Sequence, residues 1–182
     1  MKNLMMVLLV ALLFGMVAMP GIAKTSVNVT EIYSQNSPLI TFRIILRAGS
    51  INDWKGKEGI NGLTGLMITQ GGTKNLKFQE VVAKMYPWAA FINVQPDKEI
   101  TTFIGNCHRD HLDQFYKLFS DLLLNPRFDP ADFTRNKDLA LSFLEKNLRG
   151  TDDENLGKEA FSIAMFADHP YGTAGASVVG LK

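Results

Sequence analysis

Apolar and polar residues alternate along several stretches of the chain in the way typical of β-strands. Residues 27–33 alternate between apolar and polar side chains over most of their length, which predicts a strand at the edge of a sheet. Residues 39–47 are strongly apolar, which favours a central strand. Residues 88–94 and 99–105 are two more strand-like runs, and Pro96-Asp97 between them predicts the turn of an antiparallel hairpin.

The remaining apolar residues recur at helical spacing. Proline, glycine or an acidic residue marks most ends of these segments. The element order is therefore β-β-α-α-β-β-α-α-α, which predicts an α+β fold with an antiparallel sheet covered by helices. No second domain boundary is visible, so residues 24–182 are expected to form a single domain. The predicted helices cover residues 58–70, 77–85, 110–124, 129–148 and 152–166.

The first 23 residues have the features of a secretory signal peptide. Lys2 supplies a positive charge, an apolar run follows from Leu4 to Met19, and small residues precede a cleavage position after Ala23. The run is shorter than the ~20 apolar residues that span a bilayer. We therefore expect cleavage, a periplasmic or secreted protein, and no stable membrane anchor.

Composition adds few constraints on function. The chain of 182 residues is 46% hydrophobic and 20% charged, with a net charge of +1. These are ordinary globular values, and the near-zero charge argues against nucleic acid as a partner. Because Cys107 is the single cysteine, no internal disulfide can form and stability must come from the core.

The most informative stretch runs from Arg47 to Lys74. It reads as a strand end, a loop punctuated by glycine, an apolar helix and a second glycine break. Gly62 and Gly65 lie inside the predicted helix, where each costs about 1 kcal/mol relative to alanine. We expect close packing against a neighbouring element to offset this cost.

This layout resembles the pitrilysin/insulinase family of zinc metallopeptidases. Ala48-Gly49-Ser50 matches the family's strand end, Gly59 its helix start, and Gly72-Thr73 the turn that follows. The resemblance extends over residues 27–182 and implies the first domain only of a protein built from several related domains. It therefore suggests that this chain is a truncated form of a longer one.

Active members of that family carry an inverted H-x-x-E-H motif on the helix, with two zinc-binding histidines and a general-base glutamate. The matching positions here are Asn61, Thr64 and Gly65. An amide is a poor zinc ligand, a threonine hydroxyl is too weakly basic, and glycine has no side chain. The resemblance thus implies a degenerate motif without catalytic or metal-binding residues.

The family's third zinc ligand is a glutamate on the long helix, and the matching positions are Glu145 and Lys146, within one residue of register. A lone carboxylate does not make a zinc site of useful affinity. No cofactor is expected in this chain, and zinc is expected only in an active partner.

A second group of polar residues, Cys107 to His111, contains potential metal ligands and a potential nucleophile. A metal site at Cys107, His108, Asp110 and His111 is one interpretation, and a cysteine–histidine dyad is another. The alternative is a strand end leading into a helix that Asp110 caps. His169 is expected to set the chain direction after the last helix.

Together these observations predict a non-catalytic subunit or domain of a secreted zinc metallopeptidase of the pitrilysin/insulinase family. It would form a heterodimer with a catalytic homologue and help to enclose a peptide substrate. One alternative is an active metalloendopeptidase with relocated ligands, Glu145 with His108 or His111. Another is a structural scaffold subunit that makes no contact with peptide.

Overall fold

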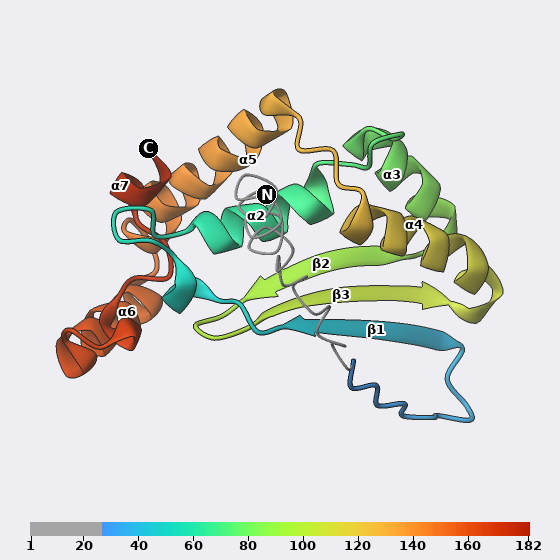
Figure 1. Ribbon diagram of the computed structural model, residues 1–182, viewed down its shortest axis with the longest axis horizontal. Coiled ribbons are helices and arrows are strands. Elements are labelled where there is room, and N and C mark those ends of the chain that lie inside the picture. Colours follow the sequence, from blue (N-terminus) through green and yellow to red (C-terminus); the bar gives the residue numbers. More distant parts are fainter. Residues whose placement is uncertain (1–26) are drawn as a thin grey trace, which may run out of the picture. The chain divides into compact units, whose positions relative to one another are not determined.

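The computed structural model describes residues 27–182, and its helices and strands lie in one compact unit, Asn36–Lys182. Three antiparallel strands form the sheet in the order β1-β3-β2 (Figure 1). Helices α2, α3 and α4 lie on one side of it (Figure 1). The predicted α+β fold is confirmed. The strands are β1 Leu39–Leu46, β2 Phe91–Pro96 and β3 Thr101–His108.

The central strand is β3, so the prediction that residues 39–47 form a central strand was wrong. The strand β1 pairs with β3 alone, and residues 43–46 are exposed. By contrast, six of the eight residues of β3 are buried. An apolar run shows that a strand packs on a core, but it does not say how many strands flank it.

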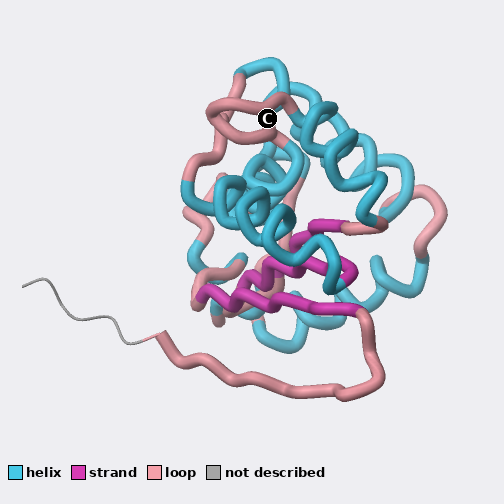
Figure 2. Tube along the Cα trace, turned by 90° about the vertical axis from the view of Figure 1, so that its right-hand side faces the viewer, coloured by secondary structure: helices cyan, strands magenta, loops and turns pink. Residues whose placement is uncertain are grey.

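The predicted strand at residues 27–33 is also absent, because these described residues form an exposed segment without strand pairing (Figure 2). Alternating side chains make a segment suited to a sheet, but a strand exists only where another backbone accepts its hydrogen bonds. The predicted signal peptide, residues 1–23, lies outside the described residues. Within residues 27–182 no helix has both the length and the hydropathy needed to cross a bilayer.

The predicted helices all form, with boundaries displaced by a few residues. The long helix after Asp129 changes to π-helical hydrogen bonding at Phe143, which the sequence pattern did not indicate. The helices are α2 Ile60–Gln70, α3 Phe78–Met85, α4 Leu112–Leu124, α5 Pro130–Ser142, α6 Asp153–Phe166 and α7 Val178–Leu181. The shorter turns are η1 Ser50–Asn52, η2 Tyr86–Trp88, η3 Arg109–His111, η4 Phe143–Leu148 and η5 Pro170–Gly172.

Two apolar clusters hold the unit together. The larger lies between the sheet and helices α3 and α4, where Phe103 of β3 packs with Phe115 and Phe119 of α4. The smaller lies away from it and consists of Leu63 of α2, Leu144 and Leu148 of η4, and Leu181 of α7. Helix α2 contributes to the smaller cluster and also contacts β2, so its position is set from two sides.

Candidate functional site

The N-terminus of α2 is organised by a carboxylate that lies outside the helix. Gly59 precedes the helix with φ +108°, a conformation that glycine adopts without strain. Asp53 accepts hydrogen bonds from the backbone N–H groups of Gly59 (2.7 Å) and Asn61 (3.0 Å). A negative charge here satisfies two N–H groups that lack a helical partner and interacts favourably with the helix dipole.

Asn61, at the first motif position, is used for packing α2 against the sheet. The Thr101 hydroxyl oxygen lies 2.8 Å from the Ala48 carbonyl oxygen and 2.7 Å from the amide group of Asn61. A hydroxyl carries one proton, and a carbonyl only accepts. Thr101 therefore donates to the Ala48 carbonyl and accepts from the Asn61 side-chain NH₂. The nitrogen of the Asn61 amide, and not its oxygen, then lies next to Thr101.

Thr64 and Gly65, at the general-base and second histidine positions, are used differently. The Thr64 hydroxyl donates to the Ile60 carbonyl of the same helix at 2.7 Å, and the residue is exposed. Gly65 is buried, and a Cβ added there would lie 2.8 Å from Cγ2 of Val94 on β2. The predicted close packing is therefore confirmed at Gly65 but not at Gly62, where an added Cβ would meet only Cγ of Pro96 at 3.8 Å.

Glu145 is exposed on η4, as is Lys146, and neither is among the buried residues of this turn. The buried residues of this turn are Leu144 and Leu148, which pack against Leu63 of α2. The contact between η4 and α2 is therefore made by apolar side chains and not by a carboxylate.

These groups do not fit a zinc ion. Zinc binds imidazole, thiolate or carboxylate groups that converge on one point. The three positions on α2 offer an amide bonded to Thr101, a hydroxyl bonded to the backbone and no side chain. Across residues 27–182 no group of three or more His, Cys, Asp or Glu side chains is placed to hold a metal ion.

The potential ligands Cys107 to His111 lie at the end of β3 and in η3, and they do not form a cluster. Cys107 is fully buried, and this burial raises the pKa of its thiol. The His108 ring accepts from the Asp110 N–H at 3.3 Å and caps η3. The N-cap of α4 is His111, so the prediction that Asp110 caps the helix running to Leu124 was wrong. The His111 ring lies against Trp88, with 6.1 Å between the ring centroids.

This end of β3 is distant from the motif positions. Thr101, the partner of Asn61, begins β3, and His108 ends it. At about 3.3 Å per residue the strand separates them by ~23 Å. The structure therefore does not bring His108 to the α2 site.

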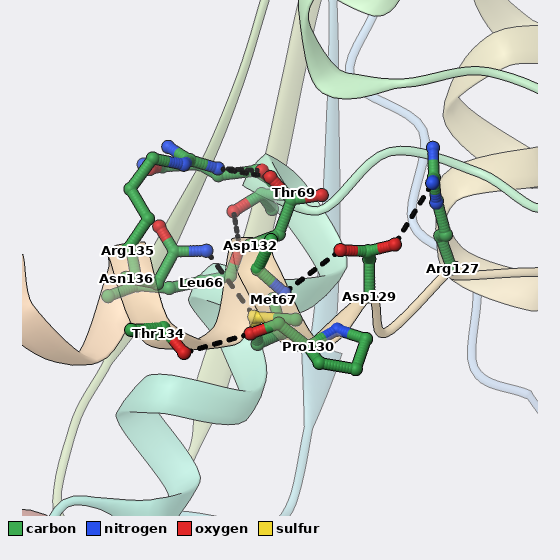
Figure 3. Close-up of polar contacts among 12 residues, drawn as sticks. Leu66, Met67, Thr69, Arg127, Asp129, Pro130, Asp132, Thr134, Arg135 and Asn136 are labelled. Carbon is green, nitrogen blue, oxygen red and sulfur yellow. Dashed lines mark hydrogen bonds and ion pairs between the residues drawn. The ribbon is translucent and has the colours of Figure 1, made fainter.

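Helix α2 is also fixed to α5. Arg135 of α5 donates to the Gln70 carbonyl at 2.7 Å and pairs with Asp132 at 3.0 Å (Figure 3). Asn136 is fully buried beside Met67, with 3.4 Å between its side-chain nitrogen and the sulfur (Figure 3). Its side-chain oxygen has no hydrogen-bond partner among the described residues. The helix is thus held near both ends by polar contacts.

A junction that the sequence analysis missed links the loop before α2 to the C-terminal helix. Glu58 accepts from the Gly56 N–H at 2.7 Å and from the Ser177 hydroxyl at 3.0 Å. The Ser177 N–H donates to the Glu58 carbonyl, and Ser177 also caps α7. No local pattern indicates this junction, because its partners are separated by more than a hundred residues.

The Glu58 carboxyl makes this junction sensitive to acid. The Gly56 N–H, and then the Glu58 N–H and the Ser177 hydroxyl, hold its pKa below the ordinary 4.5. A pKa that is lower in the folded state stabilises the fold above pH 4.5, and this stabilisation is lost as the pH falls through the folded value. We expect the free energy of unfolding to fall less between pH 6 and pH 3 in Glu58→Gln than in the wild type.

Urea denaturation at several pH values measures this difference. Glu154→Gln is the matched control, because Glu154 is exposed and pairs only with Lys158 of its own helix. An equal change in Glu58→Gln and Glu154→Gln would contradict the prediction.

The segment after α6 closes on the hairpin between β2 and β3. His169 caps η5 by accepting from the Tyr171 N–H at 3.2 Å, in agreement with its predicted role. The Tyr171 hydroxyl donates to the Glu99 carboxylate, which raises the pKa of the tyrosine. The Lys98 ammonium donates to the Thr173 carbonyl. These contacts are structural and gather no reactive groups.

Comparison with known proteins adds a family match. The sequence model for a family described as insulinase (peptidase family M16) matches residues 29–174. A search of curated proteins finds no sequence match.

Two solved structures share the fold. One is a peptidase M16 inactive domain from Pseudomonas fluorescens, with a TM-score of 0.67, 19% identity and 80% coverage of this chain. The other is a protease from Helicobacter pylori, with a TM-score of 0.66, 20% identity and 80% coverage. This chain spans 35% of the length of each of them.

Proposed function

The chain belongs to the insulinase family of peptidases (family M16), and on that premise we propose that it is a non-catalytic domain of such a peptidase. It would help to enclose peptide substrates together with a separate, zinc-bearing homologue. The observation that carries the proposal is that α2 is present at the motif position, with Asn61, Thr64 and Gly65 in place of the zinc ligands and the general base. One of the similar structures is itself described as an inactive domain.

The side chains at the motif positions of α2 are not suited to peptide hydrolysis. Peptide hydrolysis by a zinc enzyme needs a metal-bound water and a general base beside it. Asn61 and Thr64 are engaged in hydrogen bonds with Thr101 and Ile60, and Gly65 has no side chain. The exposed Glu145 supplies a single carboxylate. These residues support a role without bond cleavage.

The retained scaffold supports peptide contact. Among the described strands β2 lies at an edge of the sheet, and α2 packs against it. An edge strand presents unpaired N–H and C=O groups to which an extended peptide can add as a further strand. Peptide binding beside α2 therefore requires no catalytic residue in this chain.

Export of the mature protein is part of the proposal. Cleavage after Ala23 would leave Lys24 as the first residue, and this follows from the sequence pattern alone. Mass spectrometry of the protein from the periplasmic fraction of its producing cell checks it, and an intact Met1 terminus would contradict it.

The proposed function is tested with the purified mature chain and an H-x-x-E-H homologue from the same organism. The chain alone should contain no stoichiometric zinc and should not hydrolyse peptides, and the homologue under the same protocol serves as the positive control. Mixing the two should give a complex with increased peptide hydrolysis. Stoichiometric zinc with chelator-sensitive hydrolysis by this chain alone would overturn the proposal.

The two alternatives make different predictions in the same experiment. Relocated ligands, Glu145 with His108 or His111, would give zinc-dependent hydrolysis that Glu145→Ala abolishes, although no group of three or more potential ligands converges among the described residues. A scaffold subunit would form the complex without any change in peptide hydrolysis.

A further inference from the structure

We infer that Val94 of β2 leaves no room for a side chain at residue 65, the second ligand position of α2. Histidines introduced at residues 61 and 65 would therefore not restore metal binding while Val94 is present. The inference rests on the proposed function only in treating residue 65 as the former ligand position. It concerns whether the packing of α2 on β2 leaves room for a side chain at residue 65.

The geometry that carries it is the approach of α2 to β2. A Cβ at residue 65 would lie 2.8 Å from Cγ2 and 3.5 Å from Cγ1 of Val94. Ordinary contacts between carbon atoms are 3.5 to 4.0 Å. The remaining nearby atom, the Cβ of Val94, is 3.7 Å away and would be acceptable. The obstruction therefore comes from one methyl group, Cγ2 of Val94, whereas Cγ1 and Cβ lie at ordinary contact distances.

Val94 has little freedom to move aside. It is 8% exposed and belongs to the larger apolar cluster. Its strand is paired with β3, where Val94 lies opposite Phe103. A β-branched side chain also has few χ1 alternatives. Any side chain at residue 65 must therefore push the helix away from the sheet.

Other contacts of α2 also limit its movement away from the sheet. Leu63 packs against Leu144 and Leu148, and Asn61 is bonded to Thr101. An outward shift of α2 would disturb both sets of contacts. Imidazole is much larger than a methyl group, so a histidine at residue 65 meets this obstruction more severely than an alanine.

Gly62 provides a control within the same helix. A Cβ at Gly62 would meet only Cγ of Pro96, at 3.8 Å. Glycine is a poor helix former at either position. Gly62→Ala should therefore raise the melting temperature by roughly 2–4 °C. Gly65→Ala should lower it, because the contact with Val94 outweighs the gain in helix propensity.

The decisive measurement is a double-mutant cycle on melting temperature. In the Val94→Ala background the obstruction is gone, and Gly65→Ala should raise the melting temperature by roughly 2–4 °C. The same substitution thus changes sign with residue 94, and Gly62→Ala does not. If Gly65→Ala has the same effect in both backgrounds, the inference is wrong.

Metal binding provides a second readout. Two histidines four residues apart on a helix can share one metal ion. We expect Asn61→His with Gly65→His to bind Zn²⁺ by titration calorimetry at least tenfold more tightly when Val94→Ala is also present. Equal binding in the two backgrounds, or binding in neither, would overturn the inference.

These outcomes are separable from failure of the proposed function. Zinc-dependent hydrolysis by the wild-type chain would reject the proposed function. It would not affect the test of Val94, which depends only on how Gly65→Ala changes the melting temperature in the two backgrounds. Conversely, a fold that accepts alanine at residue 65 without loss would reject the role of Val94 and leave the non-catalytic role intact.

Discussion

Replacing Gly49 with alanine is expected to destabilise the domain by about 3 kcal/mol or more. A Cβ at this position would overlap the backbone carbonyl groups of Asp97 and Lys98. The same carbonyls accept hydrogen bonds from the N–H groups of Ser50 and Ile51, each at 3.0 Å. The clash is with backbone atoms and cannot be relieved by rotating a side chain, so these two hydrogen bonds should be lost.

The matched control for Gly49→Ala is the same substitution at Gly157. Gly157 is an exposed residue inside α6, with nothing within 4 Å of an added Cβ. Gly157→Ala should stabilise the protein by about 1 kcal/mol through helix propensity alone. Urea denaturation of both variants gives the comparison, and a loss of less than about 1 kcal/mol for Gly49→Ala would contradict the assigned packing.

Truncation of Leu144 to alanine is expected to cost about 2–5 kcal/mol, as for other buried leucines. Leu144 is 5% exposed and contributes to the cluster that joins η4 to α2 and α7. Its neighbour Glu145 is exposed, so Glu145→Ala should change stability by no more than about 0.5 kcal/mol.

This pair of variants compares the structural and the ligand interpretation of η4. Chemical denaturation measures the stability of both, and zinc content is measured in parallel. If Glu145→Ala were the more damaging change, or if it removed bound zinc, the carboxylate and not the leucine would be the functional residue of this turn.

Local signals explain why most elements could be predicted. Pro96-Asp97 begins the turn of the hairpin, Asp129 caps α5 through the Ala131 N–H at 2.9 Å, and Asp152 caps α6 through Asn155 at 3.0 Å. Each of these signals acts within a few residues, so the sequence shows it directly. The buried stripe of α4, with Phe115, Phe119 and Leu122, follows from helical periodicity in the same way.

Two of the errors concern relations between distant segments, and two concern local backbone geometry that periodicity does not show. The positions of residues 27–33 and of β1 depend on which backbones pair, and periodicity does not carry that information. The cap of η3 depends on the His108 ring and not on the nearby carboxylate of Asp110. The π-helical turn at Phe143 contains Leu144 and Leu148, which pack with Leu63 of α2.

The sequence by itself determined the fold class, the family resemblance and the absence of zinc ligands at Asn61, Thr64 and Gly65, because these depend on residue types and short spacings. Only the tertiary structure decided what these residues do instead. Asn61 meets Thr101 forty residues away, and Gly65 meets Val94 on another element. Such contacts form only when the chain brings separate elements together, so no local pattern encodes them.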